Sequence, residues 1–345
     1  MKKLLALLLV LAALFCVFAG CAKTDTTTPS GETQSSDSSA DTAAADAAET
    51  TDETAQTETS GKKFKIGFSQ CTMKHGWRVC MADGNIDWAK ENWPDAEIVF
   101  TNADDSEVQQ VQDMEDLIAA GCDLILISPL TSEALTDVCQ RALDQGIYVV
   151  TIDRMVNCDV TAHIGGDNLE IAAMDAEKLI ELTGGKGTVV ECAGTSGTSV
   201  TNDRHDGFAN ALEGTDIQII DSQDCDFARA NAMEYIEDVL SKYDPSEITA
   251  IYCHNDEMAM GAYLALQAAG EAGKIMIFSC DGQNDVIDEI VNGNITQTAV
   301  YSTCAPDAMI LAKKIVEGES YDKLVVPESV VINADNAAEM VGTGY

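Results

Sequence analysis

Residues 147–154 read Ile-Tyr-Val-Val-Thr-Ile-Asp-Arg, a run of mostly β-branched or aromatic residues that ends abruptly in an acid and an arginine. A continuous apolar run of this length is typical of a strand buried on both faces of a parallel sheet. In open α/β sheets, ligands bind outside the carboxyl ends of the strands, where Asp153 and Arg154 would lie. The carboxylate of Asp153 accepts hydrogen bonds and the planar guanidinium of Arg154 donates them, so together they suit a small polyhydroxylated molecule. The alternative is that the two residues form a surface salt bridge.

From residue 63 onwards, an apolar strand, a loop and an amphipathic helix alternate along the chain. A first cycle predicts strands at residues 64–69, 97–101, 124–128 and 147–154. A second cycle follows a lead-in at 162–166 and predicts strands at 188–192, 216–221, 249–254, 274–280 and 295–301, with a final extended segment at 323–332. This alternation predicts an α/β fold with parallel sheets, and two sets of similar size predict two similar lobes with a cleft between them.

The chain is strongly acidic: 58 Asp and Glu against 20 Lys and Arg give its 345 residues a formal net charge of −38. Phosphate backbones and anionic lipid surfaces repel such a body, so no nucleic-acid partner is expected. The four histidines lack metal-ligand spacing, and no Gly-x-Ser-x-Gly motif is present. We therefore expect no metal, no other cofactor and no enzyme, although the many carboxylates leave a glycosidase pair open.

The first residues carry an export signal, because two lysines precede a leucine-rich run that is too short for a stable membrane span. Residues 1–21 end in Phe-Ala-Gly-Cys, which resembles a bacterial lipobox in which Cys21 becomes the lipidated N-terminus; ordinary cleavage is the alternative. Residues 22–62 are almost all Thr, Ser, Ala, Asp, Glu and Gln and cannot bury a core. They predict a disordered tether that holds an extracytoplasmic body to the cell membrane through lipid.

Ten cysteines lie beyond the tether, and no pair shows Cys-x-x-Cys spacing. Several sit on or beside apolar runs, where cysteine behaves as a small buried hydrophobe. We expect most of them to be free thiols, which in an exported protein points to an anaerobic habitat. One or two disulfides are left open by the sequence.

Three of the five arginines in the chain, Arg78, Arg154 and Arg204, lie in loops that follow predicted strands. Elsewhere the positive charge is almost all lysine. Guanidinium suits planar, multidentate donation, so this clustering indicates a binding site; local pairing with acids is the alternative. Trp77 and Phe227 lie in the same kind of loop and are candidate platforms for the apolar face of a sugar, or else core residues at helix starts.

Several short stretches carry a further signal, which is specific in combination although each alone is weak. They are Ile66-Gly67-Phe68-Ser69-Gln70, Val111-Gln112-Asp113, Thr151-Ile152-Asp153-Arg154, Gly166-Asp167-Asn168, Asp203-Arg204-x-x-Gly207-Phe208, Asp226-Phe227-x-Arg229, His254-Asn255-Asp256-Glu257-Met258 and Asp281-Gly282. Together they resemble the type I periplasmic sugar-binding proteins of ABC transporters, the ribose-binding-protein group. The Phe-Ser-Gln start, Gly76-Trp77-Arg78 and the His-Asn-Asp triplet are most similar to the galactofuranose-binding branch.

The resemblance implies two Rossmann-like lobes joined by three crossings, near residues 166/167, 302 and 325. The N-terminal lobe would be 63–166 plus 303–325, and the C-terminal lobe 167–302 plus 326–345. Hinge closure would bury a monosaccharide and present a fixed lobe geometry to the permease of an ABC importer. A sensor for chemotaxis or a two-component system would read the same closure and is the alternative. A monomer is implied, and the signal and tether replace the DNA-binding helices of the similar LacI-type repressors.

The resemblance also implies the residues of the site. The expected hydrogen-bonding partners of the sugar are Asp153, Arg154, Arg204, Asn255 and Asp281, with Trp77 and Phe227 flanking the ring, Arg78 matching an arginine of the galactofuranose branch, and Tyr301 contributing from the end of its strand. Cys280 stands where the ribose binder has an aromatic residue, which argues against ribose. We therefore expect a neutral hexose or pentose. A ligand with a carboxylate or phosphate is the alternative if one arginine is left unbalanced.

Overall fold

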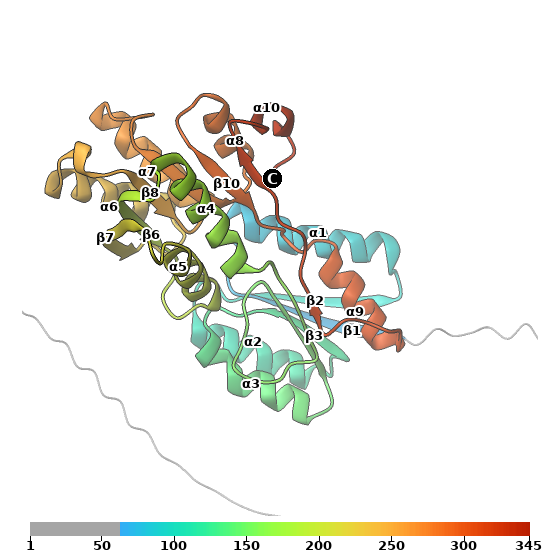
Figure 1. Ribbon diagram of the computed structural model, residues 1–345. Coiled ribbons are helices and arrows are strands. Elements are labelled where there is room, and N and C mark those ends of the chain that lie inside the picture. The colour runs from blue at the N-terminus through green and yellow to red at the C-terminus, as the bar shows by residue number, and fades with distance from the viewer. Residues whose placement is uncertain (1–62) are drawn as a thin grey trace, which may run out of the picture. The chain divides into compact units, whose positions relative to one another are not determined.

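The computed structural model describes residues 63–345, so the predicted signal peptide, the lipidation site at Cys21 and the tether lie outside the described residues. Within 63–345 the strands form two six-stranded sheets, each flanked by helices (Figure 1). None of the helices in this range is long and apolar enough to span a bilayer. The two sheets confirm the α/β architecture expected from the alternating pattern.

The first sheet has the strand order β11-β5-β4-β3-β1-β2, and all its strands pair in parallel. The strands are β1 Phe64–Gln70, β2 Ala96–Asn102, β3 Leu124–Ser128, β4 Tyr148–Ile152, β5 Ala162–Ile164 and β11 Leu324–Val325. Helices α1 (Gly76–Asn92), α2 (Glu107–Ala119), α3 (Ser132–Asp144) and α9 (Asp307–Glu317) accompany them. Every residue of β3 is buried, and β4 is buried except at Tyr148, as central strands covered on both faces require.

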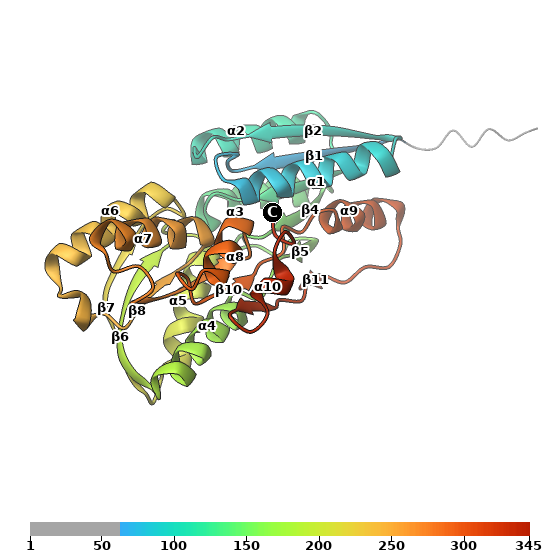
Figure 2. The same cartoon turned by 90° about the horizontal axis from the view of Figure 1, so that it is seen from above.

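The second sheet has the order β12-β10-β9-β8-β6-β7, in which only the edge strand β12 is antiparallel to its neighbour. Its strands are β6 Lys186–Ala193, β7 Asp216–Asp224, β8 Ala250–Cys253, β9 Met276–Asp281, β10 Gln297–Val300 and β12 Val331–Asn333. The accompanying helices are α4 Asn168–Thr183, α5 Ser199–Ala211, α6 Arg229–Lys242, α7 Asp256–Ala269, α8 Asn284–Val291 and α10 Ala337–Met340. Figure 2 shows the second sheet and its helices beside the first sheet and its helices.

The chain passes between the two sheets three times. The passages lie between β5 and α4, between β10 and α9, and between β11 and β12. We call the elements of the first sheet, with α1, α2, α3 and α9, the first lobe, and the remaining elements the second lobe. Because both sheets are almost entirely parallel, the loops at the carboxyl ends of several strands in each lobe gather at one edge.

Two stretches differ from their expected form. Strand β7 extends to Asp224 rather than ending at 221, because a register shift between Val189 and Val190 keeps it paired with β6. The segment 323–332, expected as one extended piece, divides into β11 in the first sheet and β12 in the second. Pairing decides this division: β11 bonds to β5, whereas the Val330 carbonyl accepts from the Val300 amide of β10.

The ten cysteines of residues 63–345 are all free, and eight of them are buried. Cys139 lies in the apolar cluster between β3, β4 and their helices. Burial raises the pKa of its thiol to about 12, so this side chain stays neutral and packs as an apolar group.

Candidate functional site

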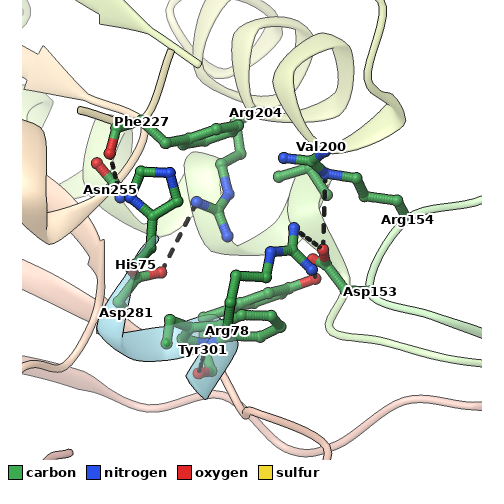
Figure 3. Close-up of a pocket in the computed structure, with 11 residues that line it drawn as sticks. His75, Arg78, Asp153, Arg154, Val200, Arg204, Phe227, Asn255, Asp281 and Tyr301 are labelled. Atoms are coloured by element: carbon green, nitrogen blue, oxygen red, sulfur yellow. Dashed lines mark hydrogen bonds and ion pairs between the residues drawn. The ribbon is translucent and has the colours of Figure 1, made fainter. Parts of the chain in front are cut away.

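A pocket between the two lobes gathers the side chains expected in the site (Figure 3). Its lining comprises His75, Trp77, Arg78, Asp153, Arg154, Val200, Arg204, Phe227, Asn255, Asp281 and Tyr301. All nine residues predicted as ligand-binding are in this set, and His75 and Val200 join them. The free volume among these side chains is about 40 Å³, since the three arginines fill much of the space.

The side chain of Asp153 lies at the centre of the first-lobe half of the pocket. It directly follows β4 and adopts φ 66°, which turns the chain sharply after the strand. Its Oδ2 lies 2.6 Å from Nη2 of Arg78 and 3.7 Å from Nε of Arg154, and the Tyr301 hydroxyl donates to Oδ1 at 2.7 Å. Burial favours the neutral acid, but the two guanidinium groups outweigh burial and hold the pKa of Asp153 below its ordinary value.

Arg78 extends from the first turn of α1 toward Asp153. Its Nη1 donates to the Ser128 hydroxyl at 2.6 Å, at the end of β3. The guanidinium carbon also lies 4.9 Å from the centre of the Trp77 ring. That ring stacks on Tyr301 with centroids 5.4 Å apart, and its indole N–H donates to the Tyr301 carbonyl at 3.2 Å. Trp77 is therefore packed against protein groups and supports Arg78 and Tyr301 in the pocket wall.

Arg154 has one buried donor without a hydrogen-bond partner. Its Nη1 donates to the carbonyl oxygen of Leu130 at 2.8 Å, which fixes the guanidinium plane. Its Nε is buried without a hydrogen-bond partner in the described structure. The guanidinium carbon lies 5.6 Å from the centre of the Phe227 ring, on the second lobe. The nearest acceptor to this Nε is Asp153 Oδ2 at 3.7 Å, beyond hydrogen-bond range, so the donor remains available to a polar group that enters the pocket.

Arg204 is the central side chain of the second-lobe half and comes from α5. Its Nε donates to Asn168 Oδ1 at 2.9 Å, and its Nη1 donates to the His254 carbonyl oxygen. The same Nη1 lies 3.9 Å from Asp281 Oδ1, and the guanidinium carbon lies 4.6 Å from the centre of the Tyr301 ring. These contacts aim one planar cation at the space between the lobes.

Asp281 ends strand β9 with φ 132°, an unusual value for a residue with a side chain. Burial raises the pKa of its carboxyl well above the ordinary value, and the nearby Arg204 only partly opposes this. Behind it, Asp256 accepts from the backbone amides of Gly282 at 2.8 Å and Gln283 at 2.7 Å. Asp256 thereby holds the turn that orients Asp281, and burial raises its own pKa to about 6.

Asn255 has a local structural role in addition to its place in the pocket. Its Oδ1 accepts from the Met258 amide at 3.0 Å, which caps the N-terminus of α7. Its amide nitrogen lies 3.4 Å from the Phe227 carbonyl oxygen. Both contacts orient the side chain where Asn255 lines the pocket.

Several contributors were missed from the sequence. Asn168 positions Arg204, and it belongs to the Gly-Asp-Asn stretch already noted, so a signal for it existed. Ser128 ends a strand and could have been found by the same strand-end rule that identified Asp153. Tyr345 donates its hydroxyl to Asp281 Oδ2 at 3.1 Å, and no local pattern in the sequence announces this contact.

Two hydrogen bonds join the lobes at the edge of the pocket. The Met155 amide donates to the Ser199 hydroxyl at 3.0 Å, across from first to second lobe. The Ser132 amide at the start of α3 lies 3.4 Å from the Gly197 carbonyl oxygen. The lobes therefore meet directly, and the pocket residues are nearly all buried.

A buried carboxyl below the second-lobe wall gives a pH-dependent prediction. Asp175 on α4 is fully buried; it accepts from Gln297 Nε2 at 2.9 Å, and burial raises its pKa well above the ordinary value. The folded chain thus keeps a proton that the unfolded chain releases above about pH 4, so this group lowers stability as pH rises. We expect Asp175→Asn to raise the unfolding temperature at about pH 8, and less so at about pH 5.

The measurement is thermal unfolding of the wild type and of Asp175→Asn across this range. Glu177→Gln is the matched control, because Glu177 is exposed on the same helix. Its effect should be small at both ends of the range. A loss of stability in Asp175→Asn that is the same at both pH values would contradict the prediction.

Comparison with known proteins agrees with this geometry. The family model described as a periplasmic binding protein domain matches residues 66–319. The ribose import binding protein RbsB of Bacillus subtilis (strain 168) is 30% identical over 76% of this chain and 87% of its own length. The galactofuranose-binding protein YtfQ of Escherichia coli (strain K12) is 32% identical over 79% of this chain and 89% of its own.

A solved structure has the same fold. It is titled the fructose binding periplasmic domain of a hybrid two component system, and it superposes with a TM-score of 0.76 at 30% identity. The match covers 80% of this chain and 93% of that one. The expected two-lobed architecture is confirmed by this likeness together with the sheet topology. The chain belongs to the periplasmic binding protein domain family and has its type I fold.

Proposed function

We propose that this chain is an extracytoplasmic binding protein that captures a neutral monosaccharide between its lobes and delivers it to an ABC importer. The observation that carries the proposal is the convergence of Arg78, Arg154, Arg204, Asp153 and Asp281 on one pocket. Carboxylates and guanidinium groups form charge-assisted hydrogen bonds with hydroxyls, each contributing roughly 1.5–3 kcal/mol. Relatives named for binding ribose and galactofuranose support the same ligand class.

Ligand entry requires the pocket to open. A cavity of about 40 Å³ has room for only a few waters, since one water needs roughly 10–15 Å³ in this measure, whereas small-molecule pockets occupy roughly 300–1,000 Å³. A monosaccharide needs several times this space, so the lobes separate, or side chains move, before it enters. The three passages of the chain between the sheets supply the hinge, with lobes of residues 63–166 plus 303–325 and 167–302 plus 326–345. Closure then buries the sugar and fixes the surface that a permease recognises.

The charges in and behind the pocket favour a neutral ligand. Three arginines face Asp153 and Asp281, and Asp256 lies directly behind the turn that follows Asp281. Asp153 is held in its ionised form, whereas burial raises the pKa of Asp281 and of Asp256. An added carboxylate or phosphate would be buried beside the carboxyl groups of Asp153 and Asp281, and their mutual repulsion costs free energy that a neutral sugar avoids. Phe227 supplies an apolar ring for a face of the sugar.

A sensor role and catalysis are the alternatives to import. A sensor uses the same lobe closure, and the structure titled as part of a hybrid two component system has this fold. A neighbouring permease and ATPase in the genome would favour import. Catalysis is not proposed, because Asp153 is already paired with two arginines, Asp281 accepts from a tyrosine, and the relatives are named as binding proteins. We propose a monomer.

The function is tested by a thermal-shift screen with D-ribose, L-arabinose, D-fructose, D-galactose, D-allose and two sugar acids, D-galacturonate and D-gluconate. A protein that binds a neutral monosaccharide is stabilised by that sugar in proportion to the logarithm of its concentration above the Kd. Stabilisation by at least one neutral sugar supports the proposal. Stabilisation by the acids alone would contradict the neutral-ligand assignment.

We further propose a lipid anchor at Cys21, which rests on the sequence preceding it. Cys21→Ser removes the thiol that would be acylated, so the variant should leave the membrane fraction and appear in the soluble extracytoplasmic fraction. The measurement is fractionation with immunodetection, and Cys16→Ser, within the same apolar run, is the control that should stay bound. A Cys21→Ser protein that is processed yet still membrane-bound would contradict the anchor.

A further inference from the structure

Residues 341–345, which follow α10, bring one side chain to the wall of the pocket. The Tyr345 hydroxyl donates to Asp281 Oδ2 at 3.1 Å, and the Gln283 side-chain amide lies 3.1 Å from the same hydroxyl. One of the two carboxylate oxygens of Asp281 is thus already engaged. Its other oxygen, Oδ1, is the one that lies near Arg204.

The segment is tied to the second lobe by its backbone. The Asn284 side chain accepts from the Gly344 amide at 3.0 Å and donates to the Gly344 carbonyl at 2.9 Å. A Cβ on Gly344 would lie 2.2 Å from the Gly282 carbonyl oxygen, so this close approach requires glycine. Tyr345 is therefore held beside the turn after Asp281 by a contact that a larger residue at position 344 would not permit.

The ring of Tyr345 meets the other lobe. A Cβ placed on Gly76, the first residue of α1, would lie 3.9 Å from Tyr345 Cε2, so the ring lies directly beside the start of α1. The ring also packs against an apolar cluster that spans both lobes and includes Trp77 of α1 and Cys280 of β9. In both Figure 1 and Figure 2 the C-terminal end of the chain lies beside α1. One side chain thus bonds to the second lobe and packs on the first.

We propose that Tyr345 is a positioning residue for Asp281 and a latch that holds the lobes closed over a bound sugar. This inference rests on the proposed function. The hydroxyl fixes the carboxylate so that Oδ1 is presented to the ligand. The ring loses its contact with α1 when the lobes separate, because its backbone stays with the second lobe. The latch therefore stabilises the closed form relative to the open form and slows release of the sugar.

The test separates the two contributions of the side chain. Tyr345→Phe removes the hydroxyl and keeps the ring, whereas Tyr345→Ala removes both. Tyr321→Phe is the control, because Tyr321 is exposed between α9 and β11. Stopped-flow tryptophan fluorescence follows binding and release of the neutral panel sugar that the wild type binds best, since Trp77 lines the pocket.

We expect Tyr345→Ala to release the sugar roughly ten- to a hundredfold faster, which corresponds to losing a buried hydrogen bond and an apolar contact. Tyr345→Phe should be intermediate and Tyr321→Phe unchanged. The association rate and the sugar-free unfolding temperature should stay near those of the wild type in all three.

Two results would overturn the latch while leaving the proposed function intact. The first is release from Tyr345→Ala at the wild-type rate. The second is a fall in the sugar-free unfolding temperature together with slower association, which would mean that Tyr345 only supports the fold. A wild type that binds none of the panel sugars would overturn the proposed function, and the latch with it.

Discussion

Asp153→Ala should lower the free energy of unfolding by roughly 3–5 kcal/mol and abolish measurable sugar binding. The carboxylate pairs with Arg78 and lies near Arg154, and it accepts from the Tyr301 hydroxyl, all in buried positions. Its removal leaves two buried guanidinium groups without their counter-charge. Both arginines belong to the first lobe, so the loss is present whether the lobes are open or closed.

The measurement is denaturant unfolding of the sugar-free protein, followed by calorimetry with the best panel sugar. Asp159→Ala is the matched control, because Asp159 is 88% exposed in its pairing with Lys323. An exposed pair of this kind contributes about 0–1 kcal/mol, so the control should be close to the wild type in both measurements. Equal stability of Asp153→Ala and Asp159→Ala would remove Asp153 from the centre of the site.

Asp281→Ala should weaken sugar binding by roughly ten- to a hundredfold while changing the sugar-free stability little. Burial already opposes the charged form of this carboxyl, and Arg204 lies 3.9 Å away rather than in direct contact. Arg204 also keeps its bonds to Asn168 and to the His254 carbonyl oxygen in the variant. The free energy of unfolding of the sugar-free protein should therefore change little. The bound sugar, in contrast, loses a hydrogen-bond acceptor.

Calorimetry and thermal unfolding on the same preparation check this pair of effects. Asp288→Ala, exposed on α8 of the same lobe, should alter neither. Unchanged affinity in Asp281→Ala would exclude it from the ligand contacts. A large loss of sugar-free stability would instead show that its main role is in the fold.

The strand-end rule explains why the composition of the pocket could be predicted from the sequence. Apolar runs predicted the ends of the strands to within about three residues. The polar residue that follows each run was then a candidate for the binding site. Asp153 after β4 and Asp281 at the end of β9 are the plainest cases. Parallel strands present these ends at one edge, so local pattern is sufficient to select the residues.

The partners within the pocket could not be predicted in the same way. The bond from Tyr301 to Asp153 joins residues 148 positions apart, and no periodicity encodes which acceptor a hydroxyl meets. The stacking of Trp77 on Tyr301 joins residues 224 positions apart and is equally remote in sequence. Tyr345 lies after the last predicted element, so only tertiary packing reveals its contact with Asp281.

The central claim is that a neutral sugar binds among three arginines and the acids that face them. Stopped-flow association of the best panel ligand at low and at high salt tests this claim most directly. A neutral ligand in a buried site should bind with nearly the same rate at both, because screening acts mainly on exposed charges. A rate that rises markedly with salt, as expected for an anion approaching a body of net charge −38, or binding of the sugar acids alone, would contradict it.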